Sequence, residues 1–361
     1  MHCAVRSRAF AFFLLLSVSY FLLTGCASLS RRMDSGPEGP DLPISADSQA
    51  PETFSAPAEK PGKMGETTSS GRGSHYVPGL VWYPKAQVIG RNRGHMVAEK
   101  ETLLDIARFH NLGYNELVDL YPHIDPWMPP KGEELLIPAQ RILPDVPADG
   151  IVINTPEMRL YYFTARNGQP RVLTFPIGVG GEDYPTPIGM YAIHEKRTHP
   201  VWYIPPSLQP KYGAKTMPPG PDNPLGDYMM KLGSSDYGIH GTNIPWSIGR
   251  MATHGCIRLY PEDIRRLFPM VRPGTRVRLL YQPVKVAQVN GRIFIEVHRD
   301  VYGRMGDLRR YAENLLLWKD LFKNVDRVKL HRVVQQQNGL PADITRGRQT
   351  SSPATVRVTP D

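Results

Sequence analysis

The chain has 361 residues, enough for two or three domains, and 41% of them are hydrophobic, so an ordinary globular core can form. Its formal net charge of +9 permits acidic partners such as anionic lipid or acidic polymers. No block rich in Lys and Arg with interleaved aromatic residues is present, so we expect no nucleic-acid partner.

Residues 1–25 have the pattern of a signal peptide. Arg6 and Arg8 precede an apolar run, residues 9–23, that is too short to span a bilayer comfortably. The segment 23–26, L-T-G-C, then resembles the bacterial lipobox, in which the peptide is cut before a cysteine that receives lipid. The resemblance implies a lipid anchor on Cys26 at the periplasmic face of a bacterial membrane, and the lack of a following aspartate favours the outer membrane. An ordinary signal anchor with a chance cysteine is the alternative.

Residues 26–75 are rich in Pro, Gly, Ser and acidic residues and poor in large apolar ones. Such a segment cannot bury enough surface to offset its ordering entropy, so we expect a disordered tether. Loss of Cys3 with the signal peptide and lipidation of Cys26 would leave Cys256 as the single thiol. An unpaired cysteine in an exported protein calls for a chemical role, and nucleophilic catalysis is the usual one.

Residues 94–140 predict a small module with the order strand, helix, helix, strand. Thr102 can cap the first helix, and the two strands are expected at residues 95–98 and 134–137. The pattern resembles a LysM module. The matching residues are Thr102, Leu103, Ile106, Ala107, Leu117, Leu135, Leu136, Ile137 and Pro138. The resemblance implies binding to glycans that contain N-acetylglucosamine, such as peptidoglycan. A subdomain that only supports its neighbour is the alternative.

Short strands separated by Gly and Pro turns predict a mainly β domain over residues 150–281, rather than a parallel doubly wound one. The strands are expected at residues 151–154, 159–163, 171–177, 190–195 and 276–281. Trp202 and Tyr228 lie near a long proline-rich loop, residues 217–226, and could line a cleft. Packing or solvent exposure is the alternative for each of them.

The residues that carry chemistry are concentrated around Cys256. It is framed by His254, Gly255 and Arg258, and His240 lies sixteen positions upstream. A thiol between imidazoles and a guanidinium meets the conditions that lower a cysteine pKa and make a nucleophile.

Each of these residue types suggests a role. Gly255 lets the backbone approach a reacting carbonyl, and the amides of Gly255 and Cys256 could form an oxyanion hole. Imidazole titrates near neutrality, which makes His240 the candidate general base. In an extended chain, His254 would share a face with Cys256 and could position the thiol. Arg258 could lower the pKa of the thiol or hold a substrate carboxylate.

The pattern of His240 followed by T-H-G-C-I-R at residues 253–258 resembles the signature of the YkuD-type (ErfK/YbiS-like) L,D-transpeptidases. The resemblance covers about residues 94–298 and implies a β-sandwich-like catalytic domain. It implies that a thiol attacks the L,D peptide bond after diaminopimelate in a tetrapeptide stem of peptidoglycan. D-Alanine leaves, and an amine acceptor then resolves the acyl-enzyme.

The resemblance assigns roles by residue match. Cys256 would be the nucleophile and His240 the general base, oriented by the backbone carbonyl of Gly241. The supporting groups would be His254, Gly255 and Arg258. We expect the substrate to contact Trp202, Tyr228 and Thr253. No cofactor and no metal is implied.

Three other interpretations stay open. His240, His254 and Cys256, with His194 or His199, could ligate zinc, although no H-E-x-x-H or paired C-x-x-C motif is present. A sortase-like transpeptidase also uses His, Cys and Arg, but its histidine lies far upstream and it lacks H-G-C. A non-catalytic peptidoglycan-binding lipoprotein with a degenerate site is the third.

The acceptor of the acyl group is open as well. It could be a second diaminopimelate, which gives a 3-3 crosslink, or the terminal lysine of an outer-membrane lipoprotein. Water would make the enzyme an L,D-carboxypeptidase or amidase. All three share the first half-reaction, so nothing near Cys256 decides between them.

Residues 282–338 predict a hairpin followed by a helix. Segments 284–289 and 292–297 flank Asn290-Gly291, which favours a type I′ turn. Residues 306 to about 334 place their apolar side chains near one helical face, which predicts one helix that docks on the catalytic domain as structural support. Residues 339–361 are polar and basic and predict a disordered tail.

Overall fold

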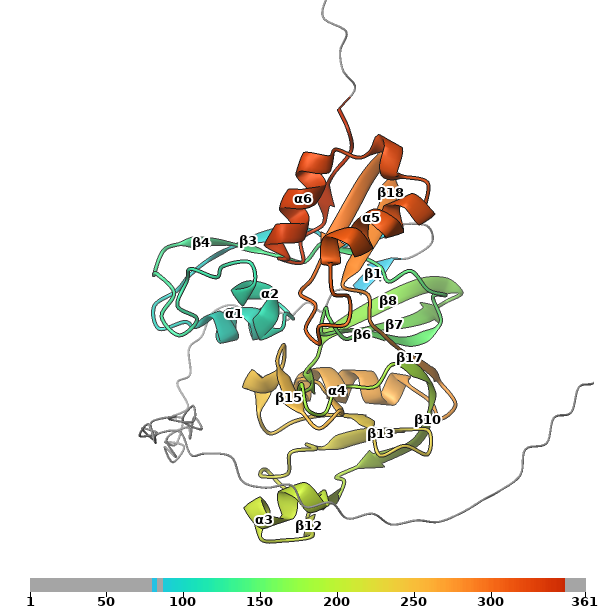
Figure 1. The fold of residues 1–361 in the computed structure, drawn as a ribbon. Coiled ribbons are helices and arrows are strands. Elements are labelled where there is room, and N and C mark those ends of the chain that lie inside the picture. The colour runs from blue at the N-terminus through green and yellow to red at the C-terminus, as the bar shows by residue number, and fades with distance from the viewer. Residues whose placement is uncertain (1–79, 83–86, 348–361) are drawn as a thin grey trace, which may run out of the picture. The chain divides into compact units, whose positions relative to one another are not determined.

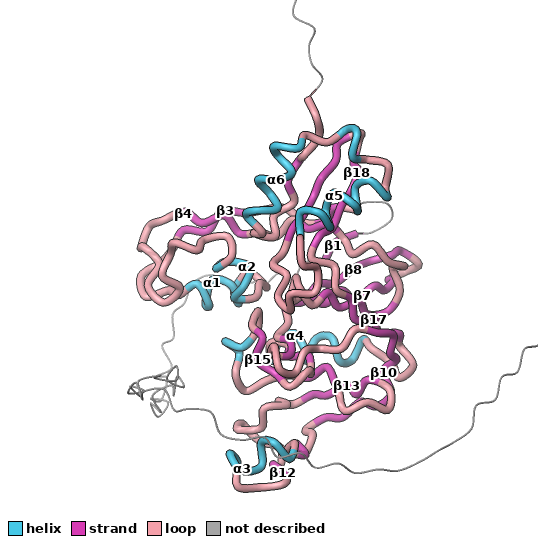
Figure 2. Tube along the Cα trace, in the orientation of Figure 1, coloured by secondary structure: helices cyan, strands magenta, loops and turns pink. Residues whose placement is uncertain are grey.

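The computed structural model describes residues 80–82 and 87–347, whose elements are drawn in Figures 1 and 2. The predicted signal peptide, the lipidation site Cys26, the tether and residues 348–361 of the predicted tail lie outside the described residues. Within the described ranges, no helix has both the length and the apolar character that crossing a bilayer requires.

One nine-stranded sheet carries the main domain. In spatial order its strands are β1 (Leu80–Trp82), β8 (Gln169–Pro176), β7 (Arg159–Arg166), β6 (Gly150–Asn154), β17 (Arg276–Leu280), β10 (Gly189–Thr198), β13 (Tyr228–Leu232), β14 (Gly238–His240) and β16 (Ile257–Arg258). Neighbouring strands are antiparallel except for the parallel pairs β6 with β17 and β14 with β16. This arrangement confirms the predicted mainly β class.

Strand β10 joins the two halves of this sheet. Its residues 189–192 pair with β17, and residues 193–198 pair with β13, with a register shift between Ile193 and Glu195. A shift of this kind bends a strand and increases its twist. Both halves therefore turn their apolar faces to one core. Its fully buried members include Ile151, Ile153, Leu160, Phe175, Met230, Ile239, Ile257 and Leu279.

Helix α4 (Pro261–Leu267) follows β16 almost directly and anchors it. Pro261 occupies the first turn, where its missing N–H costs nothing, and Glu262 lies at the positive end of the helix dipole. Ile264 and Leu267 enter the main core. The strand that follows Cys256 is thus fixed at its far end by a packed helix.

Residues 94–140 form the module expected from their pattern of strand, helix, helix and strand. The elements are β3 (Arg93–Met96), α1 (Leu103–Phe109), α2 (Tyr114–Val118) and β4 (Glu134–Ile137). The strands pair antiparallel, and Thr102 caps α1 by accepting a hydrogen bond of 3.1 Å from the backbone N–H of Asp105. The module has its own core, which includes Leu103, Ile106, Leu117, Leu135 and Ile137.

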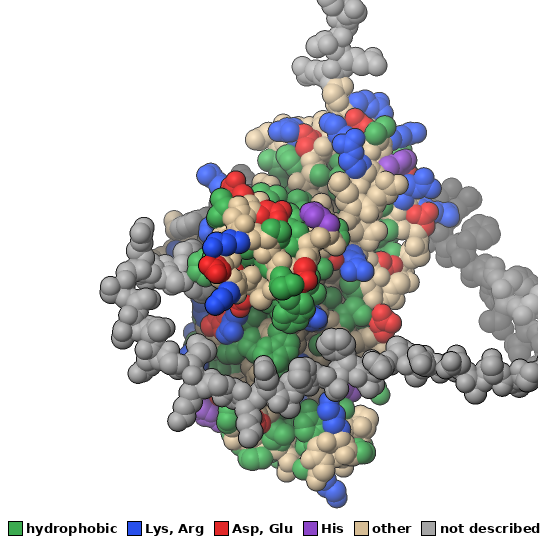
Figure 3. Space-filling model, turned by 90° about the vertical axis from the view of Figure 1, so that its left-hand side faces the viewer, with side chains coloured by type: hydrophobic (Ala, Val, Ile, Leu, Met, Phe, Trp, Pro, Cys, Tyr) green, Lys and Arg blue, Asp and Glu red, His purple; other side chains and the backbone are tan. Residues whose placement is uncertain are grey.

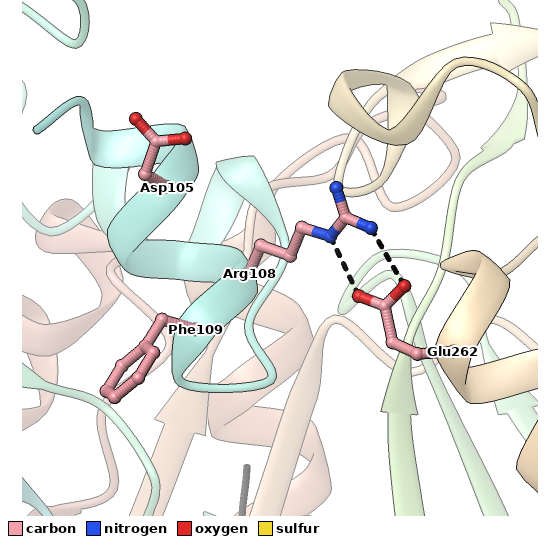
Figure 4. Close-up of a pocket in the computed structure, with 4 residues that line it drawn as sticks. All are labelled: Asp105, Arg108, Phe109 and Glu262. Carbon is pink, nitrogen blue, oxygen red and sulfur yellow. Dashed lines mark hydrogen bonds and ion pairs between the residues drawn. The ribbon is translucent and has the colours of Figure 1, made fainter. Parts of the chain in front are cut away.

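Buried charges fix this module to the main domain. Glu116 on α2 accepts hydrogen bonds of 2.6 Å from both Arg141 and Arg159, the latter on β7. At the surface, Arg108 of α1 makes two bonds, of 2.8 and 2.9 Å, to Glu262 of α4 (Figure 4).

The C-terminal part contains the expected hairpin, β18 (Val284–Val289) with β19 (Arg292–Val297), and Asn290 and Gly291 have the positive φ values of a type I′ turn. The single helix predicted after it is wrong. Two helices are present, α5 (Leu308–Trp318) and α6 (Arg327–Gln336). Asp320 adopts a left-handed conformation, and the Asp326 side chain caps α6, so local polar groups interrupt the helical run.

The predicted disorder of residues 339–361 is wrong for residues 339–347. β20 (Ala342–Asp343) pairs with β19, and Ile344 is fully buried beneath α5 and α6. The burial of Ile344 and the pairing with β19 order this polar segment, because distant residues supply the partner surface. Short elements complete the fold: β2 (Val88–Ile89), β5 (Arg141–Ile142), β9 (Val179–Gly180), β11 (Trp202–Tyr203), α3 (Gln209–Tyr212), β12 (Thr216–Met217) and β15 (Met251–Thr253).

Candidate active site

His240 ends strand β14 and is buried. Its Nδ1 lies 2.7 Å from the carbonyl oxygen of Gly241. A carbonyl only accepts hydrogen bonds, so Nδ1 carries the proton and Nε2 keeps a free lone pair. Burial, helped by the charge of Arg258, lowers the pKa of His240 from 6.5 to about 3. The expectation that this imidazole titrates near neutrality is therefore wrong, and it is neutral at pH 7.

The parallel pairing of β14 with β16 brings the predicted residues together at one edge of the sheet. His240 lies opposite Arg258 in this pair. Cys256 comes directly before β16, and the charge of Arg258 influences the pKa of both His240 and Cys256, so the imidazole and the thiol lie near the same guanidinium.

The thiol of Cys256 has a raised pKa. Its desolvation is the main cause and outweighs the N–H of Gly238 and the charge of Arg258, which both favour the thiolate. The sulfur lies 3.9 Å from the carbonyl oxygen of Asp236. The sequence predicted a lowered pKa from the flanking charges, and burial reverses that expectation. The resting site pairs a neutral thiol with a neutral imidazole.

The backbone turns sharply at Gly255, where φ is +94°. A Cβ here would lie 2.4 Å from the ring of Tyr237, so only glycine fits. The extended chain assumed for His254 is therefore not present. The exposed ring of His254 packs against Tyr184 in a tilted arrangement with centroids 4.5 Å apart, and the alternation argument that put it beside Cys256 does not hold.

Two threonine hydroxyls hold the peptide groups on either side of Cys256. Thr186 donates to the carbonyl oxygen of Gly255 at 3.1 Å, and Thr253 donates to the carbonyl oxygen of Cys256 at 2.6 Å. Thr253, predicted to contact substrate, has its hydroxyl engaged within the loop. Thr186 belongs to a loop segment that also resembles the family, but the sequence assigned it no role, because no local pattern linked it to a residue 69 positions away.

Arg258 offers a charge beside the thiol. Its backbone exchanges two hydrogen bonds with Gly178, which pin the residue in place. Within the described part of the chain, its buried Nε has no hydrogen-bond partner. A half-buried guanidinium with a free donor suits a carboxylate of the substrate.

The two aromatic residues predicted to bind substrate lie in different surroundings. Met229, and not Tyr228, lies opposite His240, so the Tyr228 ring faces the core, where it packs on Phe268. This register directs Tyr228 away from the face that carries His240, whereas the sequence led us to expect it in a substrate cleft. Trp202 packs edge to face on Tyr212, with the ring centroids 5.0 Å apart.

The histidines proposed as zinc ligands have separate partners. Exposed His199 lies 3.8 Å from a carboxylate oxygen of Asp227. Among residues 80–82 and 87–347, the potential ligand atoms that gather closely enough for a metal belong to Glu157, Glu296 and His298, none of which the zinc alternative names. Lys285 Nζ already lies 2.8 and 2.7 Å from the two carboxylates of that group.

The YkuD family model, which describes the L,D-transpeptidase catalytic domain, matches residues 148–279. The probable L,D-transpeptidase YcfS of Escherichia coli K12 is 35% identical over an alignment of 278 residues, and the match covers 72% of this chain and 86% of that protein. The chain belongs to the L,D-transpeptidase family. The probable L,D-transpeptidases YbiS of E. coli K12 and ErfK/SrfK of Salmonella typhimurium are each 34% identical to it. They align with 71% and 69% of this chain and with 88% and 84% of their own lengths.

The protein is an L,D-transpeptidase, as the motif around Cys256 predicted. The matched residues 148–279 contain every candidate catalytic residue named above. Family membership decides against the sortase-like alternative.

Proposed function

We propose that the protein is a periplasmic peptidoglycan L,D-transpeptidase with Cys256 as nucleophile and His240 as general base. The observation that carries this proposal is the hydrogen bond from His240 Nδ1 to Gly241, which leaves Nε2 free to accept a proton beside Arg258, whose charge also reaches Cys256. The donor is a tetrapeptide stem, and the bond cleaved is the L,D bond before the terminal D-alanine.

In the first half-reaction, the Cys256 proton passes to His240 Nε2 while sulfur bonds to the carbonyl carbon. Backbone N–H groups at Gly255 and Cys256 stabilise the oxyanion. The carbon–nitrogen bond to D-alanine then breaks, and the leaving amine takes the proton from the imidazolium. The raised thiol pKa and the low imidazole pKa disfavour a resting ion pair, so proton transfer accompanies attack on bound substrate.

In the second half-reaction, an amine attacks the thioester and restores the thiol. A second stem peptide would give a 3-3 crosslink, and the lysine of an outer-membrane lipoprotein would give a protein attached to peptidoglycan. Water would make the enzyme an L,D-carboxypeptidase or amidase. Muropeptide analysis of a deletion strain, scored for each product, distinguishes these acceptors.

The remaining parts would hold the enzyme at its substrate. A lipid on Cys26 would anchor it to the periplasmic face of the outer membrane, residues 26–75 would act as a tether, and the module of residues 94–140 would bind glycan as a LysM module. Mass spectrometry of the mature N-terminus tests the anchor, since an unmodified Cys26 would exclude it.

The exposed surface of the module supports glycan binding. Phe109 and Trp127 are 49% and 61% exposed, and exposed aromatic rings are typical of interaction sites. Apolar side chains are visible among charged ones on the face shown in Figure 3. Between α1 and α4 lies an open depression of about 380 Å³, lined by Asp105, Arg108, Phe109 and Glu262 (Figure 4).

Substitution of the nucleophile tests the mechanism. Wild-type enzyme incubated with tetrapeptide muropeptides should form a thioester on Cys256 and release D-alanine, and Cys256→Ala should do neither. Mass spectrometry of the protein and assay of free D-alanine measure the two outcomes. An unchanged rate in Cys256→Ala would refute the proposal, and loss of activity with excess chelator would favour the zinc alternative.

A further inference from the structure

A tyrosine from beyond the matched catalytic domain contacts the loops around the thiol. The match ends at residue 279, and Tyr302 lies in the segment between β19 and α5. Its hydroxyl donates to the carbonyl oxygen of Gly180 at 2.8 Å and accepts a hydrogen bond from the backbone N–H of Thr186 at 3.3 Å. One side chain therefore ties together both ends of the turn between Gly180 and Thr186.

This turn leads directly to the catalytic loop. The Gly180 N–H donates to the Thr186 hydroxyl at 2.9 Å, and that hydroxyl donates to the carbonyl oxygen of Gly255 at 3.1 Å. A Cβ on Gly180 would lie 2.1 Å from the carbonyl oxygen of Tyr184, so the turn is closely packed against its own backbone. Thr186 is fully buried. Its hydroxyl has one donor and one acceptor partner, and both are fixed by this geometry.

The contact with Gly255 determines the direction of the Cys256 N–H. The Gly255 carbonyl and the Cys256 N–H belong to one planar peptide group and point in opposite directions. Gly255 has no side chain to restrict its backbone, and its φ of +94° is open to it because it is glycine. The bond from Thr186 therefore holds in place the peptide group whose N–H would receive the oxyanion.

Tyr302 is itself rigidly held. Its ring stacks on Tyr281 with centroids 5.8 Å apart, and its backbone N–H donates to the Tyr281 hydroxyl at 2.8 Å. The guanidinium of Arg304 lies over both rings, 5.1 and 5.2 Å from their centroids. Asp300 accepts hydrogen bonds from the Tyr281 hydroxyl at 2.5 Å and from the backbone N–H of Met305 at 2.7 Å. This loop can therefore serve as a fixed support.

We propose that Tyr302 is a positioning residue for the L,D-transpeptidase reaction. It fixes the turn that carries Thr186 and, through the Thr186 hydroxyl, the direction of the Cys256 N–H. The proposal rests on the proposed role of Cys256. The oxyanion forms only as the transition state is approached, so loss of this positioning should lower kcat and leave the KM of the donor nearly unchanged.

Tyr302→Phe tests the proposal, because it keeps the ring between Tyr281 and Arg304 and removes only the hydroxyl. We expect kcat for D-alanine release to fall about tenfold, as misplacement of a reacting group lowers rates by such factors, with KM within about twofold of wild type. Tyr162→Phe is the matched control. It removes a tyrosine bond of 2.9 Å to the carbonyl oxygen of Met270 in the same domain, and it should leave kcat unchanged.

A double-mutant cycle tests the route through the hydroxyl of Thr186. Thr186→Val should lower kcat at least as much as Tyr302→Phe, and the double variant should lose little more, because both changes break one chain of contacts. Equal kcat in Tyr302→Phe and Tyr162→Phe, fully additive losses, or a raised KM with unchanged kcat would each overturn the proposal. If Cys256→Ala stays active, the proposed mechanism itself fails. If it is inactive while Tyr302→Phe behaves as wild type, only the positioning role is lost.

Discussion

His240 and Cys256 are held in the protonation states that their surroundings impose. Burial penalises a charged imidazole and a thiolate alike, so the pKa of His240 falls and that of Cys256 rises. The contact of His240 with Gly241 settles which nitrogen accepts a proton. Arg258 favours the thiolate of Cys256 but disfavours the protonated form of His240, so its charge has opposite effects on the two groups.

We predict that His240 makes the protein less stable as the pH falls from about 6.5 towards 3. In the unfolded chain, this histidine takes up a proton below 6.5, whereas in the native site it does so only at about 3. The unfolded state therefore binds more protons in this window. The free energy of unfolding should fall with pH by up to ~1.4 kcal/mol per unit from this residue.

Denaturant unfolding of wild type and His240→Gln across this window measures the effect. The variant has no titrating group at this position. The slope of its unfolding free energy against pH should therefore correspond to about one proton fewer taken up on unfolding. Identical pH dependence in the two proteins would contradict the burial of a neutral imidazole. Glu157, whose pKa is lowered to about 2, destabilises the fold in acid in the same direction but at lower pH, and it is present in both proteins.

At the scale of elements, helix α2 joins the module to the main domain through one carboxylate. Glu116 pairs with Arg141 and with Arg159, and the side chains of all three are nearly inaccessible. The backbone N–H of Gly113 adds a further hydrogen bond of 2.8 Å. Opposing charges and hydrogen bonds keep the pKa of Glu116 below its usual value in spite of burial. Helix α2 is therefore held by buried ion pairs, and loss of either partner would leave a buried charge without compensation.

We predict unequal effects on stability from disrupting the buried ion pairs of Glu116 and the partly exposed pair of Arg108 with Glu262. Glu116→Gln leaves two buried guanidinium groups without their counter-charge, which should lower the free energy of unfolding by about 3–5 kcal/mol. Arg108→Ala removes the pair with Glu262, whose side chains are 44% and 34% exposed, and should cost less than about 1 kcal/mol. Chemical denaturation of both variants measures the difference. Equal costs would show that burial does not govern this contact.

At the scale of the whole molecule, buried polar groups link the C-terminal hairpin to the catalytic domain. Lys285 of β18 lies between Glu157 and Glu296, and the Glu296 carboxylate also accepts a hydrogen bond of 2.5 Å from the backbone N–H of Ile142. Tyr302, which follows β19, adds a further contact, because its hydroxyl bonds to Gly180 and Thr186 in the turn next to the active site. The parts beyond residues 148–279 therefore share contacts with the catalytic domain and do more than flank it.

We predict that the module of residues 94–140 binds the enzyme to polymeric peptidoglycan. Trp127→Ala should reduce cosedimentation with insoluble peptidoglycan severalfold, because it removes an exposed ring that can stack on sugars. Trp318→Ala is the control, since Trp318 is 77% exposed on α5, outside the module, and should leave binding unchanged. If the two variants bind peptidoglycan equally well, Trp127 does not contribute to glycan binding.

Local chemistry determined much of what could be predicted from the sequence alone. Asn290-Gly291 specified the hairpin, Thr102 the start of α1, and the residues around Cys256 the enzyme class, since turns, caps and compact motifs depend on neighbours in the chain. The family resemblance also indicated the carbonyl of Gly241 as the partner of His240, and its oxygen lies 2.7 Å from His240 Nδ1.

Only the tertiary structure decided which groups share a face and which are buried. The register between β13 and β14 turns Tyr228 to the core, and the buried side chain of Ile344 orders a segment that looks disordered by composition. Burial reversed the expected pKa of Cys256, and the hydroxyl of Tyr302 reached the turn at Thr186 from 116 residues away. Each of these depends on contacts between distant parts of the chain, which residue spacing does not encode.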